Sequence, residues 1–244
     1  MSKPKVTVAL PLWDSGDIAW LCLESLCRQV TDVPWELVVV EENTPSALGL
    51  SGVFAFHERL KSAGCLNVIH LLPPLKIPLL TKWHRAAHEA SLSSGVYVMC
   101  AADNYYQPNL VQDSWDAIGS GKFDWFQSYR CHFYDIDSDK LVEYDRQKLT
   151  GIEMSMKMEL AQKIPQVVRR RGIDLFIYRY VKPQSVGWNE SVHCLNTVCT
   201  HGRNKISGSN RKNLINKVRA PFRKCSHTLS ELLPSDVREK LYSV

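Results

Sequence analysis

The sequence predicts an open α/β sheet built mainly from parallel strands, and three observations support this prediction. Strand-like and helix-like segments alternate from residue 5 to residue 104, the order expected of a sheet joined by right-handed crossovers. Residues 35–40 (WELVVV) are almost continuously apolar, as in a parallel strand buried on both faces. Polar residues follow the strands directly, and ligands of such sheets bind at the carboxyl ends of strands.

In the first half, β-rich apolar runs alternate with segments whose apolar residues recur at helical spacing. In the first helical segment, Ile18, Leu21, Leu26 and Val30 have this spacing, and Gly64 provides an end for the second. We therefore expect strands over residues 5–12, 35–40, 66–72 and 96–100, and helices over residues 17–30, 46–62 and 80–93.

The second half has a different pattern. Residues 124–134 alternate aromatic and polar side chains, and we expect them to form a hairpin with residues 140–144. Further elements are expected as helices over residues 151–163 and 174–181, a strand over residues 191–200 and a short terminal helix within residues 229–241.

The formal net charge of +5 is unevenly distributed. Residues 1–200 carry 20 Lys and Arg against 22 Asp and Glu, whereas residues 201–244 carry 10 against 3, which gives −2 and +7. A basic tail favours a polyanionic partner, although a solvated C-terminal helix is the simpler explanation on composition alone. We expect a body over residues 1–200 and a basic C-terminal extension over residues 201–244.

Several classes of protein are excluded. No apolar run approaches the roughly 20 residues of a transmembrane helix, and the N-terminus lacks the apolar core of a secretory signal. The eight cysteines form no CxxC pair, which favours a reducing compartment over a disulfide scaffold. Neither GxGxxG nor a P-loop follows the first strand, so a dinucleotide fold is not expected. We expect a cytoplasmic protein without a transmembrane segment.

The strand ends form an ordered set of motifs. The first strand runs through Pro11, the acidic pair Glu41-Glu42 follows the second, and the fourth leads into Ala101-Ala102-Asp103-Asn104. In this order and spacing the chain resembles the inverting glycosyltransferases of the GT-A fold, family-2 type. The likeness covers roughly residues 5–112 and extends more weakly to about residue 205.

The resemblance implies an α/β, Rossmann-like open mixed sheet, with a nucleotide-sugar half at residues 1–112 and an acceptor half at residues 113–200. It also implies a nucleoside diphosphate sugar donor, expected to be a UDP-sugar. Glu41 would accept hydrogen bonds from the base or ribose of the nucleotide, and Glu42 is the second candidate for this role. The alternative is that both are solvated acids on a loop.

Other residues of the expected donor site lie near the same strand ends. Pro11 and Asp14 would face the nucleotide, and Asp14 equally fits the N-cap of the first helix. Three cations can meet the phosphates, although each also fits an ordinary surface position: Lys82, Arg85 and Arg203.

The resemblance implies a divalent cation, Mn²⁺ or Mg²⁺, held by hard oxygen ligands. Such an ion neutralises charge on the leaving nucleoside diphosphate. Ala101 replaces the first acid of the family's Asp-x-Asp motif, which is expected to weaken sugar or ribose contacts, whereas Asp103 keeps the position that resembles the metal ligand, with Asn104 after it. His201 is the best candidate for a late metal contact, and His193 is the second.

An inverting transfer needs a base that deprotonates the acceptor hydroxyl. The resemblance assigns this role to Asp174, at the start of a predicted helix, with Glu153 as the alternative. A helix N-cap is the purely structural interpretation of Asp174.

The basic residues of the tail guide the choice of acceptor. Residues 203–224 hold eight Lys and Arg and no acid, a composition that suits contacts with a phosphate backbone. The chain is similar in this respect to phage-encoded enzymes that glycosylate hydroxymethylated bases in DNA, so DNA in a bacterial host cytoplasm is the leading acceptor. The alternatives are the same chemistry on a glycan, lipid-linked or protein acceptor, or a non-catalytic nucleic-acid-binding domain of the same fold.

Overall fold

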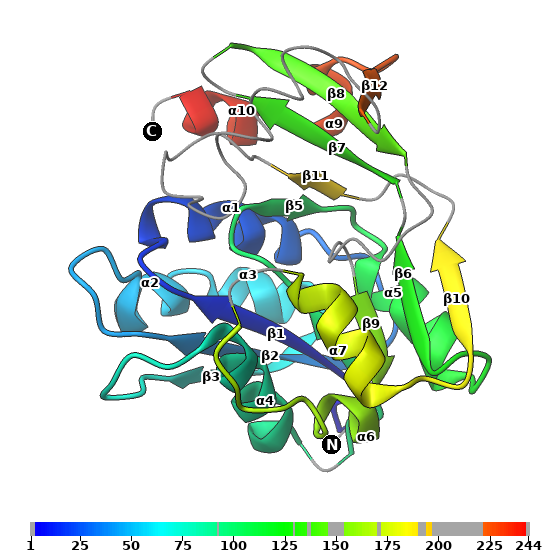
Figure 1. The fold of residues 1–244 in the computed structure, drawn as a ribbon. Coiled ribbons are helices and arrows are strands. Elements are labelled where there is room, and N and C mark those ends of the chain that lie inside the picture. The colour runs from blue at the N-terminus through cyan, green and yellow to red at the C-terminus, as the bar shows by residue number, and fades with distance from the viewer. Residues whose placement is uncertain are drawn as a thin grey trace.

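The computed structural model describes residues 3–91, 93–128, 130–135, 138–145, 154–169, 172–189, 194–196 and 222–242. These residues form two β-sheets, and helix α1 (Gly16–Leu26) lies between them (Figure 1). One side of α1 packs on the main sheet through Ala19 and Leu23. The other side packs through Trp20 and Leu21 against residues of the second sheet.

The main sheet has seven strands in the order β10-β6-β9-β4-β1-β2-β3. The neighbours β4-β1, β1-β2 and β2-β3 pair in parallel, as predicted, and β9 is antiparallel to both β4 and β6, so the sheet is mixed. Its strands are β1 (Val6–Leu12), β2 (Trp35–Glu41), β3 (Cys65–Leu71), β4 (Val96–Met99), β6 (Trp125–Ser128), β9 (Met154–Lys157) and β10 (Val186–Asn189).

Helices cover both faces of this sheet because successive residues of a strand point to opposite faces. Val8 and Leu10 of β1 enter one core and Ala9 enters the other. The first core is completed by α1, α2 (Gly49–Phe54), α3 (His57–Ser62), α5 (Leu110–Ser114) and the π-helix η1 (Trp115–Gly119). The second is completed by α4 (Leu79–Glu89), α6 (Met158–Ala161) and α7 (Ile173–Val181).

The second sheet has the order β12-β8-β7-β11-β5. The antiparallel pairing of β7 with β8 confirms the predicted hairpin. The strands are β5 (Asn104–Tyr106), β7 (Arg130–Asp135), β8 (Lys140–Asp145), β11 (Cys194–Asn196) and β12 (Phe222–Lys224).

The C-terminal residues pack on this body. Strand β12 pairs with β8, and helices α9 (Leu229–Leu232) and α10 (Ser235–Tyr242) follow it. Leu233, Val237 and Leu241 are buried in the cluster that also holds Trp20 and Tyr134. Residues 222–242 therefore contribute to the hydrophobic core.

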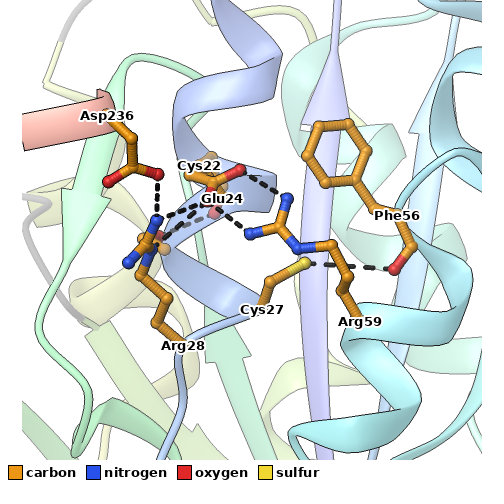
Figure 2. Close-up of polar contacts among 8 residues, drawn as sticks. Cys22, Glu24, Cys27, Arg28, Phe56, Arg59 and Asp236 are labelled. Carbon is orange, nitrogen blue, oxygen red and sulfur yellow. Dashed lines mark hydrogen bonds and ion pairs between the residues drawn. The ribbon is translucent and has the colours of Figure 1, made fainter. Parts of the chain in front are cut away.

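An ion-pair cluster also links the last helix to the first (Figure 2). Arg28 lies 2.9 Å from Glu24 and 2.5 Å from Asp236 of α10, and Arg59 of α3 contacts the same Glu24. Burial raises the pKa of Glu24, but the hydrogen bonds from Arg59 and Arg28 outweigh it and hold the pKa below its ordinary value. Glu24 is therefore held as a carboxylate between two guanidinium groups.

The helix predicted over residues 151–163 is wrong in its first part. Residues 154–157 form β9, inserted between β4 and β6, and of the described residues 154–163 only Met158–Ala161 is helical. Met154, Ser155 and Met156 are all buried, so pairing on both sides and burial on both faces override the helix propensity of Met.

Other predicted elements are divided in the structure. Residues 46–62 form two short helices, and residues 229–241 form α9 and α10 with Pro234 between them, since proline disfavours helical geometry in the residue before it. Residues 124–134 contribute β6 to the main sheet and β7 to the second. None of the helices in the described part of the chain combines the length and apolar character that a bilayer crossing requires.

Candidate active site at the carboxyl ends of the central strands

The parallel register brings the polar strand ends together. Leu12, the last residue of β1, pairs with Glu41, the last residue of β2. Trp13 and Asp14 therefore leave β1 beside the acidic pair that leaves β2. This is the edge of the sheet where ligands of parallel α/β sheets bind.

Asp14 shapes the loop after β1. Its φ of 49° is in the left-handed region, and the N-cap of α1 is Ser15, so the N-cap interpretation of Asp14 is excluded. The carboxylate of Asp14 instead accepts a hydrogen bond from the hydroxyl of Ser46, in the loop after β2. The loops that follow the first two strands are thus linked by this pair.

Glu41 is buried and engaged with its own loop. Its Oε1 accepts the N–H of Leu48 at 2.6 Å, and its Oε2 accepts that of Gly49 at 2.8 Å and lies 3.2 Å from Nε2 of His70. Burial raises the pKa of Glu41, but the hydrogen bonds from His70, Leu48 and Gly49 outweigh it and leave the pKa lowered. The role that Glu41 has in this structure is to fix the loop that borders the site.

Glu42 forms a buried ion pair with Lys82 of α4. The Lys82 ammonium lies 2.9 Å from Oε1 of Glu42 and donates to the carbonyl oxygen of Leu12 at 2.6 Å. Oε1 of Glu42 also accepts the N–H of Ile77. Burial lowers the pKa of Lys82 despite the neighbouring carboxylate. Lys82, expected at the phosphates, therefore ties β1, β2 and α4 together.

An exposed aromatic residue and an exposed cation lie beside these buried pairs. Trp13 is 44% exposed, and the ammonium of Lys76 lies 4.1 Å from the centre of its ring. Neither residue was expected from the sequence. The available signal was an aromatic residue placed between an apolar strand and Asp14. Arg85, the other cation expected on α4, is exposed.

The turn after β4 holds Asp103, the expected metal ligand. The hydroxyl of Tyr106 accepts the N–H of Ala101 at 2.8 Å and the side-chain amide of Asn104 at 3.0 Å. Asn104 is buried, whereas Asp103 is half-buried. Tyr106 thus fixes the turn on both sides of Asp103.

The fit to a metal ion rests on Asp103, whose carboxylate is the hard oxygen donor that Mn²⁺ and Mg²⁺ accept. Within the described ranges, no group of three or more His, Cys, Asp and Glu side chains lies where it could hold a metal ion. Four expected candidates fall outside the described residues: Glu153, His193, His201 and Arg203.

Asp174 lies in the first turn of α7 and is half-buried. The N-cap of α7 is Gly172, whose φ of 56° is left-handed, so Asp174 is not the cap. Ile173 and Phe176 pack against the core cluster that contains Met99, the last residue of β4. Asp174 is therefore carried by a helix that packs on the face of the sheet opposite α1.

The mixed sheet, with helices on both faces and polar strand ends at one edge, is the GT-A, Rossmann-like fold of nucleotide-sugar glycosyltransferases. TarS of S. aureus (residues 1–349, in complex with UDP-GlcNAc) matches with a TM-score of 0.61 and 14% identity, over 79% of this chain and 58% of that chain. The mannosyltransferase PcManGT of Pyrobaculum calidifontis, in complex with GDP-Man and Mn²⁺, matches with a TM-score of 0.58 and 14% identity, over 83% of this chain and 59% of that one.

At this identity the likeness defines the fold, and this chain spans about three fifths of the length of the chains it matches. A protein-family comparison and a comparison with curated proteins find no match.

Proposed function

We propose that this protein transfers a sugar from a nucleoside diphosphate sugar, expected to be a UDP-sugar, to an acceptor hydroxyl with inversion. The observation that carries the proposal is the convergence of Trp13, Lys76, the acidic pair and the Asp103 turn at the strand ends of a GT-A fold. Neighbours with this fold bind UDP-GlcNAc and GDP-Man.

Each group has a role in this proposal. The exposed face of Trp13 stacks on the base of the nucleotide, and Lys76 and Arg85 meet the diphosphate. Glu41 and Glu42, with Lys82, position the loops around it. Asp14, through Ser46, and Asn104, through Tyr106, hold the adjoining loops with their side chains. Pro11 and Asp14 border the nucleotide.

Asp103 would hold Mn²⁺ or Mg²⁺, with His201 as a further candidate ligand. When bound, the cation neutralises negative charge on the leaving nucleoside diphosphate. The neighbouring mannosyltransferase is in complex with Mn²⁺.

Asp174 is the proposed base. Its carboxylate takes the proton of the acceptor hydroxyl as the oxygen attacks the anomeric carbon and the nucleoside diphosphate leaves from the opposite side. A positioned base of this kind contributes about 10²–10⁴-fold to the rate.

The experiment measures release of nucleoside diphosphate from UDP-GlcNAc and GDP-mannose with Mn²⁺. We expect turnover by the wild type, and for Asp174→Asn a turnover lower by about 10²–10⁴-fold with unchanged donor affinity. Asp32→Asn, an exposed loop carboxylate, is the matched control. If Asp174→Asn and Asp32→Asn released nucleoside diphosphate at the same rate, Asp174 would not be the base.

The acceptor remains a prediction from the sequence. DNA is favoured by the basic residues 203–224, of which the structure describes residues 222–224, with Arg223 and Lys224 exposed. Neutralising Lys and Arg in this stretch should abolish salt-sensitive DNA retention. Retention that is unchanged would favour a glycan, lipid-linked or protein acceptor.

A second candidate function rests on one observation. Ala101 stands where the family has the first acid of its metal motif, which fits a non-catalytic nucleic-acid-binding domain of the same fold. That candidate predicts DNA binding without any turnover of nucleotide sugar, and an Asp174→Asn variant that behaves like the wild type.

A further inference from the structure

Helix α7 and the segment before it present apolar side chains to solvent. Val168 is 77% exposed, Tyr180 53%, Val167 42% and Leu175 39%. Leu175, Phe176, Arg179 and Tyr180 recur at the spacing of one helix face, and α7 lies in front of the main sheet in Figure 1. Exposed apolar side chains that lie together in this way mark candidate interaction sites.

The same face is cationic. The guanidinium of Arg169 lies 4.5 Å from the centre of the Phe176 ring, which joins residues 165–169 to the outer side of α7. Arg169, Arg179 and Lys182 are all exposed. Residues 163–182 contain six Lys and Arg and one acid, so this segment combines a net positive charge with exposed aliphatic residues.

The segment before α7 is held in place from behind. His84 and His88 of α4 contact the carbonyl oxygens of Ile164 and Gln162, at 2.8 Å and 3.3 Å. Ile164 is buried, whereas the four residues 166–169 are exposed. Val167 and Val168 thus project from an anchored backbone, which lowers the entropic cost of ordering them against a partner.

We propose that this basic apolar face, formed by Val167, Val168, Arg169, Leu175, Arg179 and Tyr180, docks on an anionic lipid bilayer. Exposed aliphatic and aromatic side chains partition into the boundary between headgroups and acyl chains, and the surrounding cations are attracted to anionic headgroups. A nucleic acid would use the cations but leaves the two valines without an apolar partner, which is why the bilayer is the occupant we favour.

The location of this face connects it with catalysis. It lies on α7, the helix that carries Asp174, and on the segment before that helix, within the acceptor half. Docking here would bring the acceptor side to a membrane surface, which favours the lipid-linked alternative over DNA as the acceptor. In this respect the inference rests on the proposed function, whereas membrane docking itself does not.

The test is co-sedimentation of the full chain with vesicles of phosphatidylcholine alone or mixed with phosphatidylglycerol, without donor or metal. We expect partitioning onto the mixed vesicles that falls with added salt. Arg169→Gln/Arg179→Gln should weaken it about thirtyfold, since each cation contributes about 1 kcal/mol near an anionic surface. Val167→Ser/Val168→Ser should weaken it about tenfold through lost apolar burial.

Matched controls alter residues of the same kind elsewhere on the surface. Lys61→Gln/Lys122→Gln removes two exposed cations, and Val30→Ser/Leu66→Ser removes two exposed aliphatic side chains. Both control variants should partition like the wild type.

Three results would overturn the inference. The first is no partitioning onto the mixed vesicles, and the second is equal loss in the control variants. The third is duplex DNA binding that depends on Arg169 and Arg179 but not on the valines. None of these results bears on donor binding, which is measured without vesicles, so the two proposals fail separately.

Discussion

The ammonium of Lys82 lies 2.9 Å from the Glu42 carboxylate, and both side chains are almost completely buried where the two central strands end. Lys82 also donates to the carbonyl of Leu12, so one cation joins the ends of β1 and β2 to α4. Removing one member of a buried ion pair leaves the other charge without its partner, which costs far more than the intact pair contributes.

We therefore expect Lys82→Met to lower the free energy of unfolding by about 3–5 kcal/mol, measured by urea denaturation. Lys82→Met/Glu42→Gln should cost less than Lys82→Met alone, because no charge is left buried. Arg85→Met, which alters an exposed cation on the same helix, should stay within about 0.5 kcal/mol. If Lys82→Met were as stable as the wild type, the structural role given to this pair would be wrong.

His132 should make stability depend on pH. The ring is buried in β7, Nε2 has no hydrogen-bond partner among the described residues, and His227 packs edge-on with ring centres 5.5 Å apart. Burial, opposed by Glu143 and reinforced by His227 and Arg130, lowers the pKa of His132 from 6.5 to about 4.

A histidine whose pKa is lowered by folding stabilises the native state above its unfolded pKa. His132 should therefore lose up to about 3 kcal/mol of stabilisation as the pH falls from 6.5 to 4. His132→Phe should flatten this part of the pH–stability profile, measured by urea denaturation at each pH, whereas His88→Gln, at an exposed position, should leave it unchanged. An unaltered profile in His132→Phe would show that another group titrates.

Trp13 should contribute to donor affinity. Stacking of a base on an aromatic ring is worth about 1–3 kcal/mol, so Trp13→Ala should raise the Kd for a bound UDP-sugar about tenfold in titration calorimetry, with little change in stability. Trp188→Ala removes a tryptophan of similar exposure, 39% against 44%, on a distant strand. Equal Kd values for Trp13→Ala and Trp188→Ala would mean that the nucleotide base does not stack on Trp13.

The C-terminal helix should contribute to stability through packing more than through charge. Leu241 is 1% exposed within the cluster that contains Trp20, so Leu241→Ala should cost about 2–5 kcal/mol. Asp236 is 64% exposed in its pair with Arg28, and Asp236→Asn should cost less than about 1 kcal/mol. Thermal unfolding compares the two, and a neutral Leu241→Ala would mean that α10 is only loosely attached.

The elements that the sequence predicts best are those with a strong local pattern. Residues 5–12 and 35–40 are mostly apolar and rich in β-branched residues, and they form the neighbouring parallel strands β1 and β2. The strand at residues 154–157 could not be predicted in this way. It forms because β4 and β6 lie far enough apart for a strand between them to pair with both.

In the site too, the positions of residues along the chain could be predicted but their non-local contacts could not. The positions of Glu41, Glu42 and Asp103 at strand ends follow from strand order. Their partners do not, because Leu48, Gly49 and Ile77 reach them through loop geometry. The contact of Trp13 with Lys76 joins two loops far apart in sequence, and neither loop has a periodic pattern that would predict the contact.

Donor binding tests the central claim most directly. Titration calorimetry of the full chain with UDP-GlcNAc and with GDP-mannose, in Mn²⁺ and in excess EDTA, measures it without assuming an acceptor. We predict saturable binding of a nucleotide sugar that strengthens with Mn²⁺, and loss of that metal-dependent gain in Asp103→Asn but not in Asp32→Asn. The absence of binding to any nucleoside diphosphate sugar, with or without metal, would contradict the account.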